Sequence, residues 1–198
     1  MAPHTLWLFV LIPIVIHPHG AAQTKGNNTA AKYVPKTSRP WPFMITSPMY
    51  LNITTLDQHN AICIKAITIE HNFKARILSQ GVVITRSDWS RDYARVDYQL
   101  IPKRGPLQAL ISVDRSGSTK YTLHHIFQHC AIIKKQMNKT NGGSMEVCDL
   151  WVNEKFFHVR REDQELCTRN FMAYCNHNYT KYKRVDCERT TYKEILLW

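Results

Sequence analysis

The sequence predicts an all-β protein, an eight-stranded antiparallel barrel with a C-terminal helix packed on its outside. Eight short runs with alternating or β-branched residues follow one another from residue 49. Turn-like stretches separate them, among them DQHN, PKRGP, DRSGS and NKTNGGS. After residue 151 the apolar period changes from that of a strand to that of a helix. A sandwich would use the same strands, but closure removes exposed strand edges, so we favour the barrel.

The predicted strands are defined by their sequence runs. They are MYLNITT (49–55), AICIKAITI (61–69), KARIL to VVIT (74–85), YARVDYQLI (93–101), LQALISV (107–113), KYTLHHIF (120–127), CAIIKKQ (130–136) and MEVCDLWV (145–152). In the third run, residues 79–81 are expected to form a turn or bulge. In the first run, a glycan on Asn52 would put Leu51 and Ile53 on the inward face. In the fourth run, the apolar residues from Ala94 to Leu100 alternate with polar ones and should face inward.

The chain is predicted to have three segments, two of which precede the folded domain. Residues 1–22 have the apolar run and small residues of a secretory signal peptide. This run is too short, and too interrupted by Pro13, to span a bilayer, and no second apolar stretch reaches spanning length. Residues 23–48 contain several prolines and are expected to form an extended lead-in, and 49–198 are expected to form the barrel, helix and tail. The predicted location is therefore secreted and extracellular.

Six cysteines behind a signal peptide predict three disulfides, although spacing alone leaves their connectivity open. Four sequons agree with a secreted glycoprotein. Their predicted acceptors are Asn27, Asn52, Asn138 and Asn178.

The formal net charge of +11 favours acidic partners such as anionic glycans, through attraction that salt screens. A basic solvated surface explains the same charge more simply. We expect no nucleic-acid partner, because the chain has no long basic run and no aromatic RNA-binding signature.

The helix is predicted over about residues 161–176, because Cys167, Phe171 and Cys175 recur every four residues. Cysteines on this stripe could pin the helix to two different strands. Alternation in CDLWV then places Cys148 outward, toward the helix, and leaves Asp149 and Trp151 facing inward.

These landmarks resemble those of the tick salivary lipocalins of the histamine-binding protein family. The resemblance covers about Tyr50 to Cys187 and rests on TTLDQHNAIC, YTLHHIFQHC, CDLWV, ELCTRNF and RVDC. The family's amine-binding signature places a cysteine and an aspartate before Glu-Leu-Trp and a further cysteine. Here Ala131 replaces the aspartate and Asp149 replaces the glutamate. The resemblance implies a lipocalin barrel with disulfides Cys63–Cys187, Cys130–Cys167 and Cys148–Cys175.

The resemblance also implies a secreted protein of tick saliva that sequesters histamine or serotonin and so helps evade host defence. An inward carboxylate would pair the amine, and aromatic faces would hold its ring. The candidate ligand-binding residues are Asp149, Trp151, Tyr98, Tyr121, His125, Phe127 and Asp57, the last of them in a loop near the entrance.

Other interpretations stay open. Asp149 could be a structural carboxylate, and the apolar interior near Ala131 suits a fatty acid or an eicosanoid such as leukotriene. Relatives that block complement suggest a protein-binding inhibitor instead. We expect no enzyme, because the sequence motifs of the secreted ribonucleases are absent, and no cofactor. We expect no metal either, since the neighbouring His124 and His125 should point to opposite faces of a strand and would not converge on one ion.

Overall fold

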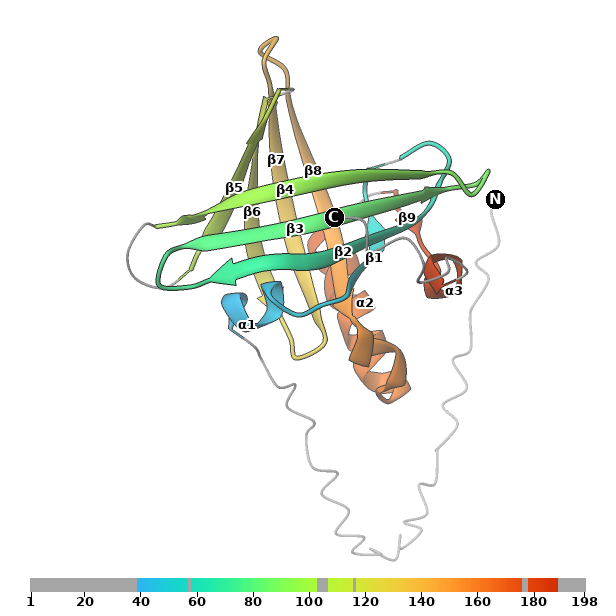
Figure 1. The fold of residues 1–198 in the computed structure, drawn as a ribbon. Coiled ribbons are helices and arrows are strands. Elements are labelled where there is room, and N and C mark those ends of the chain that lie inside the picture. The colour runs from blue at the N-terminus through green and yellow to red at the C-terminus, as the bar shows by residue number, and fades with distance from the viewer. Residues whose placement is uncertain (1–38, 57, 103–106, 116, 176–177, 189–198) are drawn as a thin grey trace, which may run out of the picture. The chain divides into compact units, whose positions relative to one another are not determined.

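The computed structural model describes residues 39–56, 58–102, 107–115, 117–175 and 178–188 (Figure 1). The strands are β1 (Met49–Thr54), β2 (Ala61–Asn72), β3 (Ile77–Arg86), β4 (Arg91–Ile101), β5 (Ala109–Asp114), β6 (Gly117–Ile126), β7 (Cys130–Lys139), β8 (Ser144–Asn153) and β9 (Thr180–Lys181). The helices are α1 (Pro40–Met44), the 3₁₀ helix η1 (Glu154–His158), α2 (Arg161–Cys175) and α3 (Arg184–Glu188). All eight runs predicted from the sequence form strands.

The strands form one closed antiparallel barrel. Each strand from β2 to β7 pairs with the next, β8 pairs with β1, and β1 pairs with β2, so that the sheet returns to its starting edge. The two-residue β9 adds to β1 alone. The predicted eight-stranded antiparallel barrel with a helix outside it is confirmed.

Two apolar layers share the wall made by β7, β8 and β1. On the outer side, Phe171 of α2 packs with Ile132, Leu150 and Val152, all of them almost fully buried. On the inner side, Ala131 and Ile133 belong to a second cluster that fills one end of the barrel. Alternation along β7 and β8 therefore supplies both layers.

The three disulfides join the outer layer. Cys63 bonds to Cys187, Cys130 to Cys167 and Cys148 to Cys175. The last two bonds fix α2 against β7 and β8, beside which it lies in Figure 1. The pairing implied by the family resemblance and the outward position of Cys148 are both confirmed.

The helix α1 lies in the segment that we expected to be extended throughout. Prolines that fix φ are tolerated in a first helical turn, and Pro40 and Pro42 both lie in α1. Phe43 and Met44 are buried in the inner cluster, and the Gln80 side-chain amide donates to the Met44 carbonyl over 2.9 Å. This short helix therefore covers one end of the barrel interior (Figure 1).

Two predictions about strand geometry are wrong. Residues 79–81 form no turn and lie inside β3, because the chain turns earlier, at residues 73–76, where Arg76 has a positive φ of 59°. A bulge does occur at this point of the ladder, but it lies in β2, where the register shifts between Thr68 and Glu70, opposite Gln80 and Ser79. In β1 the register shifts between Leu51 and Ile53 opposite β8. Leu51 faces inward as expected, but the shift turns Ile53 into the outer layer.

The fourth strand keeps its predicted alternation, since its register with β3 shows no shift and Ala94 lies opposite Val82, which packs against the inner cluster. Leu100 and Tyr98 pack in the inner cluster, whereas Ala94 is exposed. In the described part of the chain, no helix has the length and apolar character needed to cross a membrane.

The disulfides should differ in their effect on stability. Cys63 and Cys187 are 124 residues apart, whereas Cys148 and Cys175 are 27 apart. In the chain-entropy account, replacing the first pair by serine lowers the free energy of unfolding by about 5 kcal/mol, and replacing the second by about 3.5 kcal/mol. Urea unfolding of the two variants measures both values. A larger loss for the Cys148–Cys175 pair would contradict the prediction.

Candidate functional site

Asp149 lies inside the barrel and is fully buried, with 0% exposure. The hydroxyl of Thr54 donates to its Oδ1 over 2.6 Å, and the indole Nε1 of Trp151 donates to its Oδ2 over 3.3 Å. The Nζ of Lys135 lies 2.7 Å from the same Oδ2. The predicted inward position of Asp149 and Trp151 is confirmed, and the carboxylate has partners on both oxygens.

Strand pairing brings Lys135 and Asp149 together. Ile133 of β7 faces Asp149 of β8 in the ladder, and Lys135 faces Val147. Lys135 is therefore a diagonal neighbour of Asp149 on the inner face, within reach of a long side chain. Its side chain is 13% exposed. A buried carboxylate needs such a partner, because an unpaired charge in the interior is costly.

Sequence reasoning missed Lys135, although a signal for it existed. Alternation from Ala131 through Ile133 places residue 135 on the inner face. The apolar neighbours drew attention to the first two positions, and the basic side chain at the third was passed over. Thr54 was missed as well, because the bulge in β1 changes which residues of that strand face inward.

Two tyrosines line the interior near the ion pair. The rings of Tyr98 and Tyr121 meet edge to face with centroids 5.3 Å apart, and Ser112 Oγ lies 3.3 Å from the Tyr121 hydroxyl. Burial, and then the proximity of Tyr121 and Asp149, raise the pKa of Tyr98. Its phenol therefore stays protonated and neutral at physiological pH. The predicted inward position of both tyrosines is confirmed.

The inward aromatic side chains keep part of their surface accessible. Tyr98, Tyr121 and Trp151 are half-buried, whereas Ala131 and Ile133 on the same wall are 0% and 2% exposed. Trp151 also packs against two inner clusters. One is the cluster that contains Phe43 and Met44 of α1, and the other consists of Leu51, Ile64 and Tyr182. The accessible faces of these rings are the surface that a ligand inside the barrel would cover.

The prediction that His125 and Phe127 point into the barrel is wrong. The register of β6 against β7 shifts between Leu123 and Ile126, and alternation is lost there. Phe127 consequently packs against the outer layer. The His125 ring is exposed and meets the Tyr174 ring of α2, with centroids 5.3 Å apart.

His124 and His125 do not point to opposite faces, as alternation would require. Both rings contact Tyr174, and the Tyr174 hydroxyl lies 2.8 Å from His124 Nδ1. Burial lowers the pKa of His124, and the charge of Lys134 lowers it further. Over the residues that the structure describes, no three His, Cys, Asp or Glu side chains gather as a metal site would require.

The predicted glycosylation sites differ in exposure. Asn138 and Asn178 are exposed, and Asn27 lies outside the described residues, as does the candidate ligand residue Asp57. We expected Asn52 to lie on the surface, but it is buried, with 7% exposure. The chain following β9 covers it, and the backbone N–H of Tyr182 donates to the Asn52 carbonyl over 2.9 Å.

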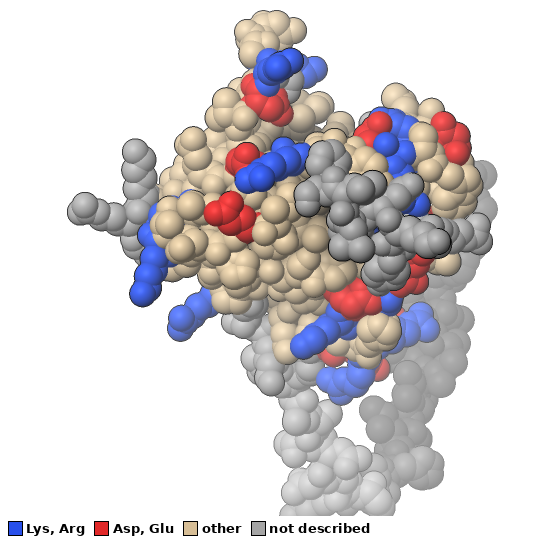
Figure 2. Space-filling model, viewed as in Figure 1, with Lys and Arg blue, Asp and Glu red and all other residues tan. Residues whose placement is uncertain are grey.

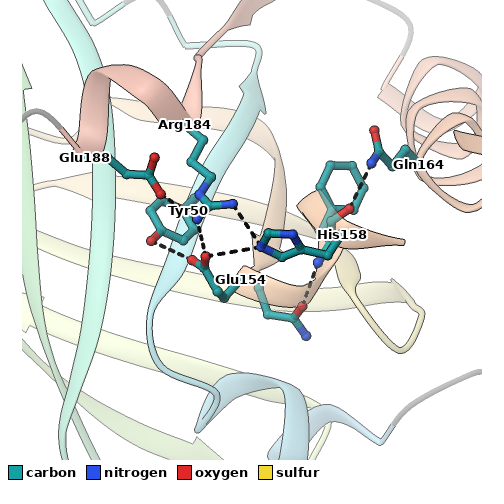
Figure 3. Close-up of polar contacts among 8 residues, drawn as sticks. Tyr50, Glu154, His158, Gln164, Arg184 and Glu188 are labelled. Atoms are coloured by element: carbon teal, nitrogen blue, oxygen red, sulfur yellow. Dashed lines mark hydrogen bonds and ion pairs between the residues drawn. The ribbon is translucent and has the colours of Figure 1, made fainter. Parts of the chain in front are cut away.

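A second polar cluster, outside the barrel, joins β1, η1 and α3 (Figure 3). The Tyr50 hydroxyl donates to Glu154 Oε2 over 2.8 Å, and burial followed by this hydrogen bond raises the pKa of Tyr50. Arg184 forms ion pairs with Glu154 and Glu188, and its guanidinium lies 5.0 Å from the Phe157 ring centroid. The cluster holds α3 against the segment that leads into α2, which is a structural task.

The charged residues are mixed on the face shown in Figure 2. Lys and Arg are spread among Asp and Glu there, without gathering in one patch. Arg86 pairs with Asp92, and Arg95 pairs with Asp97 and Glu70. Among the described residues, this face therefore shows no concentrated basic patch for an anionic glycan.

No protein-family model and no curated protein matches the sequence. Solved structures do match the fold. A dog lipocalin allergen superimposes with a TM-score of 0.53 at 11% identity, covering 75% of this chain and 98% of its own. Lobster apocrustacyanin A1 gives 0.51 at 11% identity, covering 75% and 89%. A triple mutant of bovine odorant-binding protein gives 0.50 at 10% identity, covering 70% and 93%. The barrel has the lipocalin fold.

The ion pair predicts a strongly non-additive double-mutant cycle. Asp149→Leu and Lys135→Met each leave a buried charge without its partner, and each should lower the free energy of unfolding by about 3–5 kcal/mol. Asp149→Leu combined with Lys135→Met removes both charges and should cost much less than the sum of the single changes. Urea unfolding measures the cycle, and additive losses would contradict the inferred pairing.

Proposed function

We propose that the protein is a secreted lipocalin that sequesters a small amphipathic mediator, with the polar head of the ligand at Lys135. The fold supports a carrier, and the three disulfides support an oxidising, extracellular setting. The observation that carries the choice of ligand is the buried Lys135–Asp149 pair beside the accessible faces of Trp151, Tyr98 and Tyr121. In the setting implied by the family resemblance, such a carrier would remove a host mediator at a tick feeding site.

The unused hydrogen-bond donors of Lys135 favour an acid head over an amine head. An ammonium group has three N–H donors, and within the described part of the chain the contact of Lys135 is with Asp149 alone. Two hydrogens can therefore meet the oxygens of a ligand carboxylate. The carboxylate of Asp149 already receives donors from Thr54, Trp151 and Lys135. Its negative charge is also balanced by that of Lys135.

The aromatic lining agrees with a long apolar ligand. Tyr98, Tyr121, Leu123 and Trp151 all lie on the inner face and keep accessible surface. Burial of such surface by an alkyl chain is favourable by about 25 cal/mol per Å². The fatty-acid or eicosanoid alternative is therefore the ligand class that this interior supports best.

A biogenic amine is the second candidate. Asp149 and Trp151 do share the interior, as an amine site requires. The ammonium of histamine would have to displace Lys135 from Asp149, and Ala131 provides no second carboxylate to compensate. Amine binding therefore costs the separation of an existing buried pair, which an acid-headed ligand avoids.

Calorimetric titration with leukotriene B4, histamine and serotonin tests the proposal. We expect the wild-type chain to bind the leukotriene and neither amine. Lys135→Gln keeps a hydrogen-bond donor beside Asp149 but removes the cation. It should weaken leukotriene binding by about ten- to a hundredfold, since a hydrogen bond to a charged group contributes about 1.5–3 kcal/mol. The same change frees the Asp149 charge and should produce measurable histamine binding.

Lys134 provides the matched control. It directly precedes Lys135 in β7, faces outward and pairs with Glu146 over 2.6 Å. Lys134→Gln removes the same charge from the chain and should leave both titrations unchanged. Wild-type binding of histamine that disappears in Asp149→Ala would establish the amine candidate instead. If none of the three ligands binds, the proposal fails, and contact with host proteins such as complement becomes the candidate function.

A further inference from the structure

The Nζ of Lys135 can also act as a nucleophile, a property that the proposed sequestration of an acid-headed ligand does not use. Its Nζ lies inside the barrel, 2.7 Å from the Oδ2 of a carboxylate that is 0% exposed. A lysine amine in an interior with apolar and aromatic walls can form an imine with a carbonyl compound. The carboxylate can accept and return protons at the reacting nitrogen, and it can hold the cation that results.

We propose that Lys135 captures lipophilic aldehydes as a Schiff base, with Asp149 as proton acceptor, proton donor and counter-ion. This activity goes beyond the proposed carrier function, because the bound molecule becomes covalently attached and needs no acid head. The chemical class of the substrate is an aldehyde with an alkyl or polyene tail, which the accessible faces of Tyr98, Tyr121 and Trp151 would cover.

The reaction balances with the groups present. The Lys135 ammonium gives one proton to Asp149 Oδ2, and the free amine adds to the aldehyde carbon, forming the C–N bond. The carbonyl oxygen takes a proton from the nitrogen and becomes the hydroxyl of a carbinolamine. Asp149 then returns its proton to that hydroxyl, the C–O bond breaks, and water leaves. The product is an iminium ion, and no oxidant or reductant is consumed.

The charges of the site are the same before and after the reaction. One cation on the Lys135 nitrogen faces one carboxylate in the ammonium form, and the same holds in the iminium form. The donors that hold Asp149, the Thr54 hydroxyl and the Trp151 indole, are not consumed. The site therefore needs no new counter-charge to hold the product, whereas an amine outside the barrel forms an imine that water hydrolyses.

Lys134 is again the control, because it distinguishes a lysine inside the barrel from one on the outer surface. Its side chain is 33% exposed, against 13% for Lys135, and its Nζ lies 5.5 Å from the Tyr174 ring centroid on the outside of the barrel. Both lysines have a carboxylate partner and are consecutive in β7. Preferential reaction of Lys135 would therefore report the interior and not the amine alone.

The test is reductive trapping on the mature chain with its three disulfides formed. The protein is incubated with a slight excess of decanal and sodium cyanoborohydride, and the decyl group is located by intact mass and peptide mapping. We expect a single decyl group at Lys135 in the wild-type chain and in Lys134→Arg. Lys135→Arg keeps the cation beside Asp149 but cannot form the imine, and it should lose this label.

Label spread over surface lysines in proportion to their exposure would overturn the proposal. Retention of the same single label in Lys135→Arg would overturn it as well. Peptide mapping of the wild-type chain distinguishes these outcomes even where Lys135→Arg does not fold. Leukotriene binding without labelling of Lys135 would reject the aldehyde chemistry and leave the carrier function standing. Labelling of Lys135 without leukotriene binding would support the aldehyde chemistry and reject the carrier function.

Discussion

The pairing of β7 with β8 is the constraint on which both sides of the barrel wall depend. In this register Ile133 faces Asp149, and Lys134 faces Cys148. A shift of one residue would exchange the faces of a whole strand, because side chains alternate along it. One of the two cysteines that hold α2 would then point inward, and the Lys135–Asp149 pair would be lost. The outer helix and the inner ion pair are therefore two consequences of one ladder.

The disulfides strengthen this dependence. Cys130 and Cys148 lie on neighbouring strands and bond to Cys167 and Cys175 of the same helix. Two such bonds oppose any slip of β7 against β8, because the helix fixes the separation of its own two cysteines. Covalent bonds on the outside thus keep the charged side chains in position on the inside. The site requires this rigidity, since a misplaced buried charge would be costly.

Much of the fold could be predicted from the sequence, because alternation and period are local signals. All eight strand runs, α2 and the three disulfides were predicted, and α2 ends at Cys175, one residue before its predicted end. The register shifts in β1 and β6 could not be predicted. Every residue of β1 is buried, so its burial pattern contains no alternation that would mark a shift at Leu51. In β6 the shift before Ile126 moved His125 and Phe127 to the outer side.

The candidate site was predictable in part for a related reason. The inward direction of Asp149, Trp151, Tyr98 and Tyr121 followed from alternation within regular stretches. The partner of Asp149 did not, because a lysine in a strand is usually assigned to solvent. Its side chain reaches the carboxylate only through the diagonal geometry of the β7–β8 pair. The ion pair inside the barrel could therefore be recognised only once the strand register was known.

A buried ion pair is weak evidence for stability, since apolar residues of similar size often stabilise a protein equally well or better. Retaining Lys135 and Asp149 inside a barrel therefore requires another reason, and recognition provides one. The ammonium of Lys135 occupies the position that a cationic ligand would take beside Asp149, so the chain itself competes with amines for that carboxylate. The same ammonium still has donors for an acid and a nitrogen for an aldehyde. In the proposed carrier, this lysine would favour an acid-headed ligand, where the carboxylate alone would favour an amine.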